Sequence, residues 1–294
     1  MTPDTAPLEY QFGKRRYDFA ARTHIMGVLN VTPDSFSDGG RFVDPDRAVD
    51  HALAMIGDGA DIIDVGGEST RPRGTTYGEG ADPVPVNAEL SRVLPVIERL
   101  AAATDVPISI DTYKAEVARE ALRAGACIVN DISGFRMDEH MPAVVAAAGA
   151  SAVVMHMQGT PRTMQLNPTY GDLFAEIIAF LRDAVERGRR AGIRQILVDP
   201  GLGFGKTMGD NVRLVAGLQR FRDLGCPVVV GPSRKAFLGA ILNLPVEQRL
   251  EGTLAAVAAC VLRGAHVVRV HDVKEARRVV LVADAVRREM PPLN

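Results

Sequence analysis

A short pattern that recurs along the chain constrains its fold more than any other feature. A glycine and a small or apolar residue come first, a run of mainly β-branched residues follows, and polar side chains end the run. The repeats start at Gly59, Gly125, Gly149, Gly192, Gly225 and Gly264. With the runs at 25–29 and 108–110 they make eight apolar runs. Because the runs lack polar alternation, they predict strands that are buried on both faces of a parallel sheet.

Segments with helical periodicity lie between these runs. Asp44 followed by Pro45 predicts a helix start, since aspartate caps helix N-termini and proline fits the first turn. Apolar stripes at helical spacing lie within 49–56, 90–100, 173–185 and 276–283. The run 254–262 is apolar almost all round, so we expect that helix to be the most buried.

Strands and helices that alternate in this way, about every 30–35 residues, predict a (β/α)8 TIM barrel. An open doubly wound sheet is the rival, but it usually has fewer repeats and places polar groups mainly at one switch point. Here nearly every run ends in polar groups, which favours the barrel. We therefore expect one α/β domain over residues 1–294, with its core at about 22–287. Residues 9–20 are expected to form a short hairpin across the barrel bottom, with Gly13 and Lys14 near its turn.

The composition narrows the class of protein. Apolar residues form 47% of the 294 residues, enough for a large core, and the net charge of −2 argues against a general nucleic-acid binder. The N-terminus lacks a secretory apolar region, and no apolar stretch approaches the roughly 18 residues of a membrane span. We therefore expect a soluble cytoplasmic protein without a membrane anchor. The three cysteines lie far apart in apolar runs, which predicts buried, reduced thiols.

Polar side chains follow the predicted strands, at the end of a barrel that carries the chemistry. The set comprises Asn30, Asp111, Asn130, His156, Asp199, Ser233, Lys235, Arg269 and His271. One such residue is often only a satisfied polar group, and His156, between two methionines, is expected to be structural. Burying the whole set unpaired would cost roughly 1–3 kcal/mol for each member, so a polar ligand is expected at this mouth.

The chemistry of the set indicates two kinds of ligand group. The acceptors of Asp111, Asn130 and Asp199 suit a flat heterocycle rich in N–H groups, and Lys235 and Ser233 add donors. Arg269 and His271, two residues apart, can project to one face of a strand end. Together with Asn30 they suit a phosphate or pyrophosphate, or its bound metal.

A glycine-rich segment imitates a phosphate-binding loop but does not match it. Gly205, Lys206 and Thr207 fit the end of the Walker pattern, yet Pro200 stands where its first glycine is required. We expect these glycines to form a mobile turn instead. Nothing in the spacing of His, Cys and Asp suggests a zinc site.

Several separated blocks resemble the dihydropteroate synthases. Residues 26–40 read Met-Gly-Val-Leu-Asn-Val-Thr-Pro-Asp-Ser-Phe-Ser-Asp-Gly-Gly, and residues 64–72 read Asp-Val-Gly-Gly-Glu-Ser-Thr-Arg-Pro. The further blocks lie at 110–112, 130–134, 155–168, 199–206, 233–239 and 269–272. The resemblance covers about residues 25–285. It implies condensation of 6-hydroxymethyl-7,8-dihydropterin pyrophosphate with 4-aminobenzoate, giving 7,8-dihydropteroate and pyrophosphate in folate biosynthesis.

The resemblance also implies a role for each matching residue. The pterin is expected to be held by Asp111, Asn130, Asp199 and Lys235, and the pyrophosphate and Mg²⁺ by Asn30, Arg269 and His271, with Asn30 as the metal ligand. The aminobenzoate site is expected to be shaped by Thr70, Arg71, Pro72, Phe36, Phe204 and Ser233. The expected catalytic set is Asp111, Asn130, Asp199, Lys235, Arg269 and His271. The family is thought to release the leaving group first, so that the arylamine attacks a cationic pterin methylene.

Other expectations follow from the same resemblance. A corrinoid-linked pterin-binding methyltransferase is the closest rival function, and a non-enzymatic pterin-binding protein is the other class. A homodimer and sensitivity to sulfonamides are expected. Loops 31–43 and 67–86 are expected to close over the site when the pterin substrate binds. Arg73 departs from the family pattern, and the stretch 73–85 is longer than expected.

Overall fold

The computed structural model describes residues 8–32, 44–69 and 82–289. The chain first forms a hairpin of β1 (Glu9–Phe12) and β2 (Arg15–Asp18). The remaining strands are β3 (His24–Asn30), β4 (Ile62–Gly66), β5 (Ile108–Asp111), β6 (Ile128–Asp131), β7 (Ser151–Met155), β8 (Ile196–Asp199), β9 (Val229–Val230) and β10 (Val267–Val270). The helices are α2 (Pro45–Gly57), α3 (Val86–Ala103), α4 (Ala115–Arg123), α5 (Met141–Ala147), α6 (Leu173–Ala191), α7 (Met208–Ala216), α8 (Ala236–Leu242), α9 (Leu250–Leu262) and α10 (Val273–Arg287). Two 3-10 helices, η1 (Leu218–Leu224) and η2 (Val246–Gln248), complete the elements.

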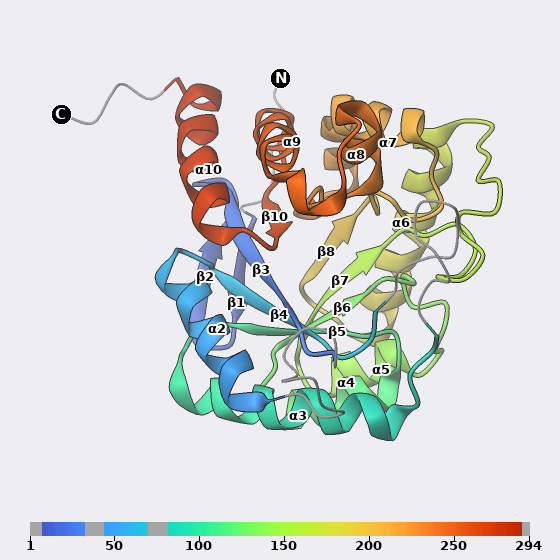
Figure 1. Cartoon of the computed structure of the whole chain (residues 1–294). Helices are drawn as coiled ribbons and strands as arrows, with labels where there is room; N and C mark the ends of the chain where they lie inside the picture. The colour runs from blue at the N-terminus through green and yellow to red at the C-terminus, as the bar shows by residue number, and fades with distance from the viewer. Residues whose placement is uncertain (1–7, 33–43, 70–81, 290–294) are drawn as a thin grey trace.

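Strands β3 to β10 form one parallel sheet in the order β8-β7-β6-β5-β4-β3-β10-β9. A single parallel bridge between Val198 and Val228 joins the two ends of this order and closes the ring. The helices lie around the outside of the strands (Figure 1). Each of the eight apolar runs that predicted a strand forms a strand of the ring, so the predicted (β/α)8 barrel is confirmed.

Two apolar cores follow from the alternation of side chains along each strand. On β4, Ile63 and Val65 face the helices and belong to the large core between strands and helices. Ile62 points into the barrel, where it packs with the hairpin residues Phe12 and Phe19. The hairpin therefore closes the barrel bottom, as predicted. Burying an aromatic side chain of this kind contributes roughly 1.5–3 kcal/mol.

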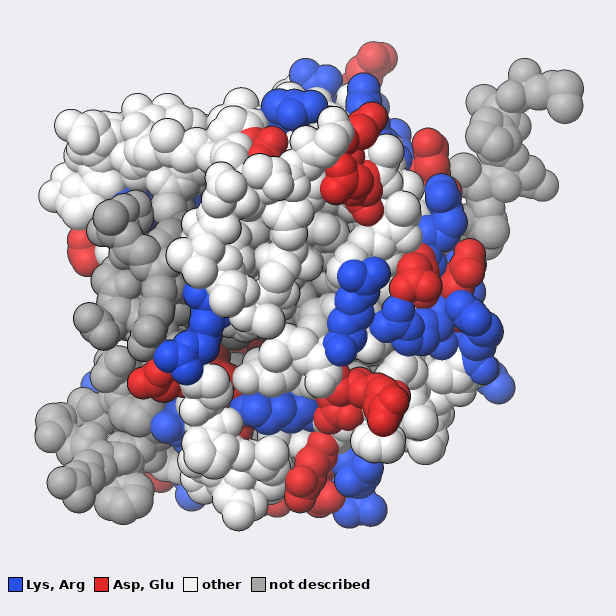
Figure 2. Space-filling model, turned by 90° about the vertical axis from the view of Figure 1, so that its right-hand side faces the viewer, with Lys and Arg blue, Asp and Glu red and all other residues white. Residues whose placement is uncertain are grey.

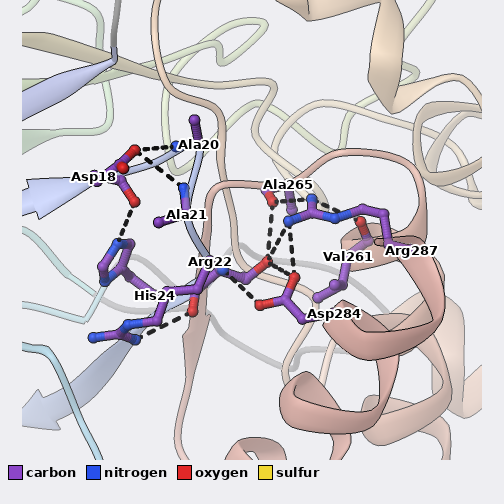
Figure 3. Close-up of polar contacts among 10 residues, drawn as sticks. Asp18, Ala20, Ala21, Arg22, His24, Val261, Ala265, Asp284 and Arg287 are labelled. Carbon is purple, nitrogen blue, oxygen red and sulfur yellow. Dashed lines mark hydrogen bonds and ion pairs between the residues drawn. The ribbon is translucent and has the colours of Figure 1, made fainter. Parts of the chain in front are cut away.

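Polar contacts tie the segment between hairpin and barrel to the last helix (Figure 3). The backbone N–H of Thr23 donates to Asp284 Oδ2 at 2.7 Å, and its hydroxyl donates to Asp284 Oδ1 at 2.9 Å. Arg287 donates to the same carboxylate at 2.8 Å, and Arg22 pairs with Asp61 at 2.6 Å. Hydrogen bonds thus join the residue before the first barrel strand to α10, although the two are far apart in the sequence.

The predicted start of one helix is confirmed, whereas the burial predicted for another helix is wrong. Asp44 caps α2, since its side chain accepts from the N–H groups of Asp46 and Arg47. The expectation that 254–262 is the most buried helix is wrong. Helix α9 packs on α7, α8 and α10, but Leu262 keeps 46% of its surface exposed and Ala255 is exposed as well. An apolar run alone does not distinguish a buried helix from one whose outer face stays uncovered.

Further properties bear on the class of protein. None of the helices in the described part of the chain combines the length and apolar character needed to cross a membrane. Cys226 and Cys260 are buried free thiols as predicted, whereas Cys127 is only partly buried. On the face drawn in Figure 2, acidic side chains (red) and basic side chains (blue) lie next to one another. Such a mixed surface is unlike the single-sign basic face of general nucleic-acid binders.

Candidate active site

The predicted pterin-facing residues meet at the carboxyl ends of the barrel strands. Asp111 ends β5 and lies beside Asn130 of β6 in the parallel register. A cavity of about 40 Å³ is lined by Asp111, Asn130, Asp199, Lys235 and Arg269, together with Ile132, Met155, Leu202, Phe204 and Gly231. The prediction that these five polar side chains converge is therefore confirmed by the geometry. The mixed lining offers acceptors and cationic donors beside apolar walls.

A guanidinium that lines this cavity bridges two carboxylates. Arg269 Nε donates to Asp64 Oδ2 at 2.6 Å, and Arg269 Nη2 donates to Asp111 Oδ2 at 2.7 Å. Burial raises the pKa of Asp111 to about 7, against the opposing charge of Arg269, and the neighbouring charge of Asp64 adds to the rise. Burial favours the neutral form of Arg269, but Asp64 and Asp111 hold its pKa above the ordinary value.

Lys235 and Asp199 form the opposite wall of the cavity. Burial and the charge of Arg269 lower the pKa of Lys235 to about 8, although Asp199 and Asp111 oppose the shift. Its ammonium lies 4.3 Å from the centre of the Phe204 ring, close enough for a cation–π contact. Burial raises the pKa of Asp199, whose Oδ1 accepts from the backbone N–H of Gly201 at 2.6 Å. This wall presents a donor and an acceptor side by side.

A larger chamber of about 730 Å³ opens outward from the cavity. Its lining includes Asn30, Phe204, Ser233, Arg234, Lys235, Arg249, Arg269 and His271. Several of these side chains are cationic, and Phe204, Lys235 and Arg269 line both spaces. The chamber is therefore suited to an anionic group that extends from a ligand seated in the cavity.

His271 is oriented by Ser233 at the wall of this chamber. Ser233 Oγ lies 2.9 Å from His271 Nδ1 and accepts from the backbone N–H of His271 at 3.3 Å. Burial, with the charge of Arg269, lowers the pKa of His271 to about 4. In the tautomer in which the Ser233 hydroxyl donates to Nδ1, Nε2 carries the ring proton. A neutral His271 in that tautomer would offer a hydrogen bond to an anion rather than a positive charge.

The glycine-rich loop after β8, expected to be a mobile turn, packs closely against the barrel interior in this structure. Gly201 has a φ of +72°, and a β-carbon there would lie 2.0 Å from the carbonyl oxygen of His156. The buried Lys206 Nζ lies 2.9 Å from His156 Nδ1 and donates to Phe204 O at 2.9 Å. The glycines permit close backbone approach, and His156 is an interior contact of this loop, in line with its expected structural role.

A second buried ionic cluster lies where the 67–86 segment leaves and rejoins the barrel. Lys114 Nζ donates to Glu68 Oε2 at 2.5 Å, to Glu89 Oε2 at 2.6 Å and to Val84 O at 2.7 Å. Glu68 also accepts from the Tyr113 hydroxyl at 2.9 Å. One ammonium therefore ties residues 68 and 84 to the barrel at the same point.

The sequence patterns did not single out Asp64 and Arg234 at the site, or Lys114 in the second ionic cluster. Asp64 lies within an apolar run, two residues after the inward-facing Ile62. Because side chains two residues apart on a strand share a face, this spacing could have indicated that Asp64 points into the barrel. Lys114 and Arg234 carried no local signal, since their partners Glu89 and Asp272 are distant in sequence. The expected site residues Phe36, Thr70, Arg71 and Pro72, and the departure at Arg73, lie outside the described residues.

Comparisons with known proteins bear on the same site. The family model described as "Pterin binding enzyme" matches residues 26–271. A dihydropteroate synthase of Synechocystis sp. is 45% identical, covering 97% of this chain and 97% of its own length. The dihydropteroate synthase of Escherichia coli is 47% identical, with 89% of this chain and 91% of its own length covered.

Solved structures give the same picture. The Yersinia pestis dihydropteroate synthase with a sulfonamide drug complex superposes with a TM-score of 0.88 at 41% identity, covering 95% of this chain and 99% of that one. The Xanthomonas albilineans dihydropteroate synthase with 4-aminobenzoic acid gives 0.87 at 41% identity, with 98% and 100% covered. The likeness thus extends over nearly the whole chain in both sequence and fold.

Proposed function

The chain belongs to the pterin-binding enzyme family, among its dihydropteroate synthases, and from that premise we propose how its barrel mouth performs the reaction. The enzyme is a transferase that joins a dihydropterin methylene to the amine of 4-aminobenzoate and releases pyrophosphate. The observation that carries the assignment of roles is the convergence of Asp111, Asn130, Asp199, Lys235 and Arg269 on one cavity.

The cavity is proposed to hold the pterin ring. Asn130 and Asp199 offer acceptors for the N–H groups of the ring, and the nearby ammonium of Lys235 offers a donor to its carbonyl or ring nitrogen. In the structure Arg269 is bound to Asp111 inside a space of about 40 Å³. A bicyclic ring needs more room than one or two water molecules, so we propose that pterin entry moves the guanidinium away from Asp111. That shift turns Arg269 toward the outer chamber and frees a carboxylate oxygen of Asp111 for the ring.

The outer chamber is proposed to hold the pyrophosphate with Mg²⁺. No group of three or more His, Cys, Asp or Glu side chains in the described ranges is placed to hold a metal. Magnesium suits this setting, because it keeps several waters and is commonly bound by one or two protein oxygens and a substrate phosphate. Asn30 lines the outer chamber together with Arg269 and His271, which supports its amide oxygen as the proposed protein ligand.

In the proposed reaction, the main role of the protein side chains is to stabilise the charges that develop on the leaving group and the pterin. The bond between the pterin methylene and the bridging oxygen breaks, and its electron pair leaves with pyrophosphate. Arg269 and the Nε2 N–H of His271 are proposed to receive that developing negative charge. Bound Mg²⁺ would neutralise part of it. The carboxylate of Asp111 stabilises the cationic ring system, and the arylamine nitrogen then forms the new bond and loses a proton.

The aminobenzoate is proposed to sit between the chamber wall and the two loops. Phe204 and Ser233 are placed for this on described elements, whereas Phe36, Thr70, Arg71 and Pro72 are carried by the family resemblance. The corrinoid-linked methyltransferase is the weaker reading, since both curated relatives named above are synthases. Sulfonamide sensitivity, a cytoplasmic location and a homodimer remain proposals of the same kind.

Pyrophosphate release on mixing the two substrates with Mg²⁺ tests the function directly. We expect release only when both substrates are present, together with a product that contains pterin and aminobenzoate. Asn30→Ala should raise the Mg²⁺ concentration needed for half-maximal rate, while Asp46→Ala, an exposed site on α2, should not. Methyl transfer without pyrophosphate release would contradict the proposed function.

A further inference from the structure

Asp64 is an acidic side chain at the barrel centre to which none of the substrate contacts above is assigned. It is the third residue of β4 and is fully buried. Its Oδ2 accepts from Arg269 Nε at 2.6 Å and from Asn130 Nδ2 at 3.0 Å. Its Oδ1 is buried without a hydrogen-bond partner among the described residues. A buried carboxylate is costly to keep, so its contacts with two predicted ligand-binding residues call for an explanation.

The contact with Asn130 decides which end of that amide meets a ligand. An amide has an acceptor end and a donor end, and a carboxylate paired with arginine can only accept. Asn130 Nδ2 must therefore face Asp64, and Asn130 Oδ1 is turned away from it. Since Asn130 lines the cavity, the group available to a ligand there is a carbonyl oxygen. Asp64 thus selects N–H groups on the ligand at this position.

Through its contact with Arg269, Asp64 shares the guanidinium with a second carboxylate, Asp111. Nε is bound to Asp64 and Nη2 to Asp111, so the plane of the group is fixed at both edges. Within the described part of the chain Nη1 makes no hydrogen bond, and Arg269 also lines the outer chamber. When a pterin displaces Nη2 from Asp111, the bond from Nε to Asp64 can remain. Asp64 then acts as the fixed end about which the guanidinium turns.

We propose that Asp64 is a positioning residue for the first substrate, fixing Asn130 as an acceptor and anchoring Arg269 between the ring cavity and the phosphate chamber. This inference rests on the proposed function, because it assigns the heterocycle and the leaving group to those two spaces. It commits Asp64 to the pterin pyrophosphate and not to the aminobenzoate.

The first test separates the two substrates. In Asp64→Asn the side-chain volume stays and the charge goes. The loss of one charge-assisted hydrogen bond should lower kcat/KM for the pterin pyrophosphate about tenfold to a hundredfold. The KM for 4-aminobenzoate should stay within about twofold, because Asp64 contacts Asn130 and Arg269, and neither of these is assigned to the aminobenzoate. An equal loss for both substrates would overturn the proposal.

The second test examines the orientation of the amide. The exchange Asp64→Asn with Asn130→Asp keeps one carboxylate and one amide in contact, and it still presents an acceptor to the ligand. We expect the exchanged pair to recover part of the activity lost in Asp64→Asn alone. Asp64→Ala and Asn130→Ala should be strongly non-additive when combined, because they act through one contact. Additive losses and no rescue would show that Asp64 does not act through Asn130.

Asp131 provides a matched control. It is a buried carboxylate at the end of β6, and its oxygens accept from Ser133 and from the backbone N–H of Phe135, away from Arg269. Asp131→Asn should lower the unfolding midpoint but leave kcat/KM per folded enzyme unchanged. If Asp64→Asn behaves in the same way, its role is structural only.

Calorimetric titration with 6-hydroxymethylpterin keeps the inference separate from the reaction. We expect about tenfold weaker binding to Asp64→Asn than to the unmodified enzyme, even in the absence of turnover. Unchanged pterin binding refutes the inference, whereas normal pterin binding to the unmodified enzyme without pyrophosphate release refutes the proposed function instead.

Discussion

Replacing Lys114 by methionine tests how the segment between β4 and α3 is held. The ammonium of Lys114 makes three hydrogen bonds, to Glu68, Glu89 and the carbonyl of Val84. Methionine has a similar length and no charge, so Lys114→Met removes the bonds without creating a large void. Glu89, whose side chain is fully buried, then loses its counter-charge.

The size of the effect follows from that burial. Removing one partner of a buried ion pair typically costs about 3–5 kcal/mol, because the remaining charge is left without compensation. The side chains of Lys114, Glu68 and Glu89 are 14%, 9% and 0% exposed, so solvent screens this cluster little. We expect the free energy of unfolding to fall by about 3–5 kcal/mol. Adding Glu89→Gln should restore part of this loss, since the unpaired charge is then absent.

The loss should also depend on pH. Burial already raises the pKa of Glu89 above its usual range although Lys114 opposes the shift. In Lys114→Met that opposition is gone, so the pKa in the folded state rises further. A carboxyl group with a raised folded pKa stabilises the fold below the unfolded pKa of about 4.3, and this stabilisation is lost as pH rises through the folded pKa. The variant should therefore regain stability when the pH is lowered from 8 to 5.

Urea unfolding at several pH values, followed by circular dichroism, measures both effects. Lys14→Met is the matched control, because Lys14 pairs with Asp105 at the surface and should leave the midpoint unchanged. A loss in Lys114→Met as small as in this control would refute the reasoning. A loss that is the same at pH 5 and pH 8 would refute the part assigned to Glu89.

Three further predictions concern the site and the barrel bottom. The kcat/KM for the pterin pyrophosphate should rise with pH through an apparent pKa near 7, because burial raises the pKa of Asp111 to about 7 and its ionised form is needed; a flat profile from pH 5.5 to 8 would contradict this. Phe12→Ala should lower the free energy of unfolding by about 3–5 kcal/mol, because it leaves a cavity in the core at the barrel bottom. Steady-state kinetics of the folded variant should give an unchanged KM for both substrates. Gly201→Ala should lower both stability and pterin binding, because its β-carbon would lie 2.0 Å from the His156 carbonyl oxygen and would disturb the Gly201 N–H that donates to Asp199. Melting and titration curves of the variant that match those of the unmodified enzyme would contradict this.

The barrel could be predicted from sequence because its strands are buried on both faces. Such strands appear as apolar runs, and the run around Ile62 marks β4 without reference to any partner. The site residues at strand ends, such as Asp111 and Asp199, were predictable for the same reason, since parallel strands bring their carboxyl ends to one side of the barrel.

What could not be predicted depends on contacts between distant segments. The bond between Asp64 and Arg269 joins residues 205 positions apart, and nothing local marks it. The close packing at Gly201 could not be predicted, because a glycine can indicate either conformational freedom or close backbone approach, and the neighbouring His156 lies far away in the sequence. The exposed side of α9 was missed because an apolar run does not show whether a neighbour covers it.

The ring of strands has a weak seam, and the proposed ligand lies across it. Strand β9 has two residues and meets β8 through the single bridge between Val198 and Val228. Asp199 stands on one side of this seam and Lys235 follows β9 on the other, and both line the same cavity. A pterin bound to both residues would add a second connection between β8 and β9, beside the single backbone bridge. A ligand that binds only the closed barrel stabilises it, so the pterin should slow amide exchange along this seam.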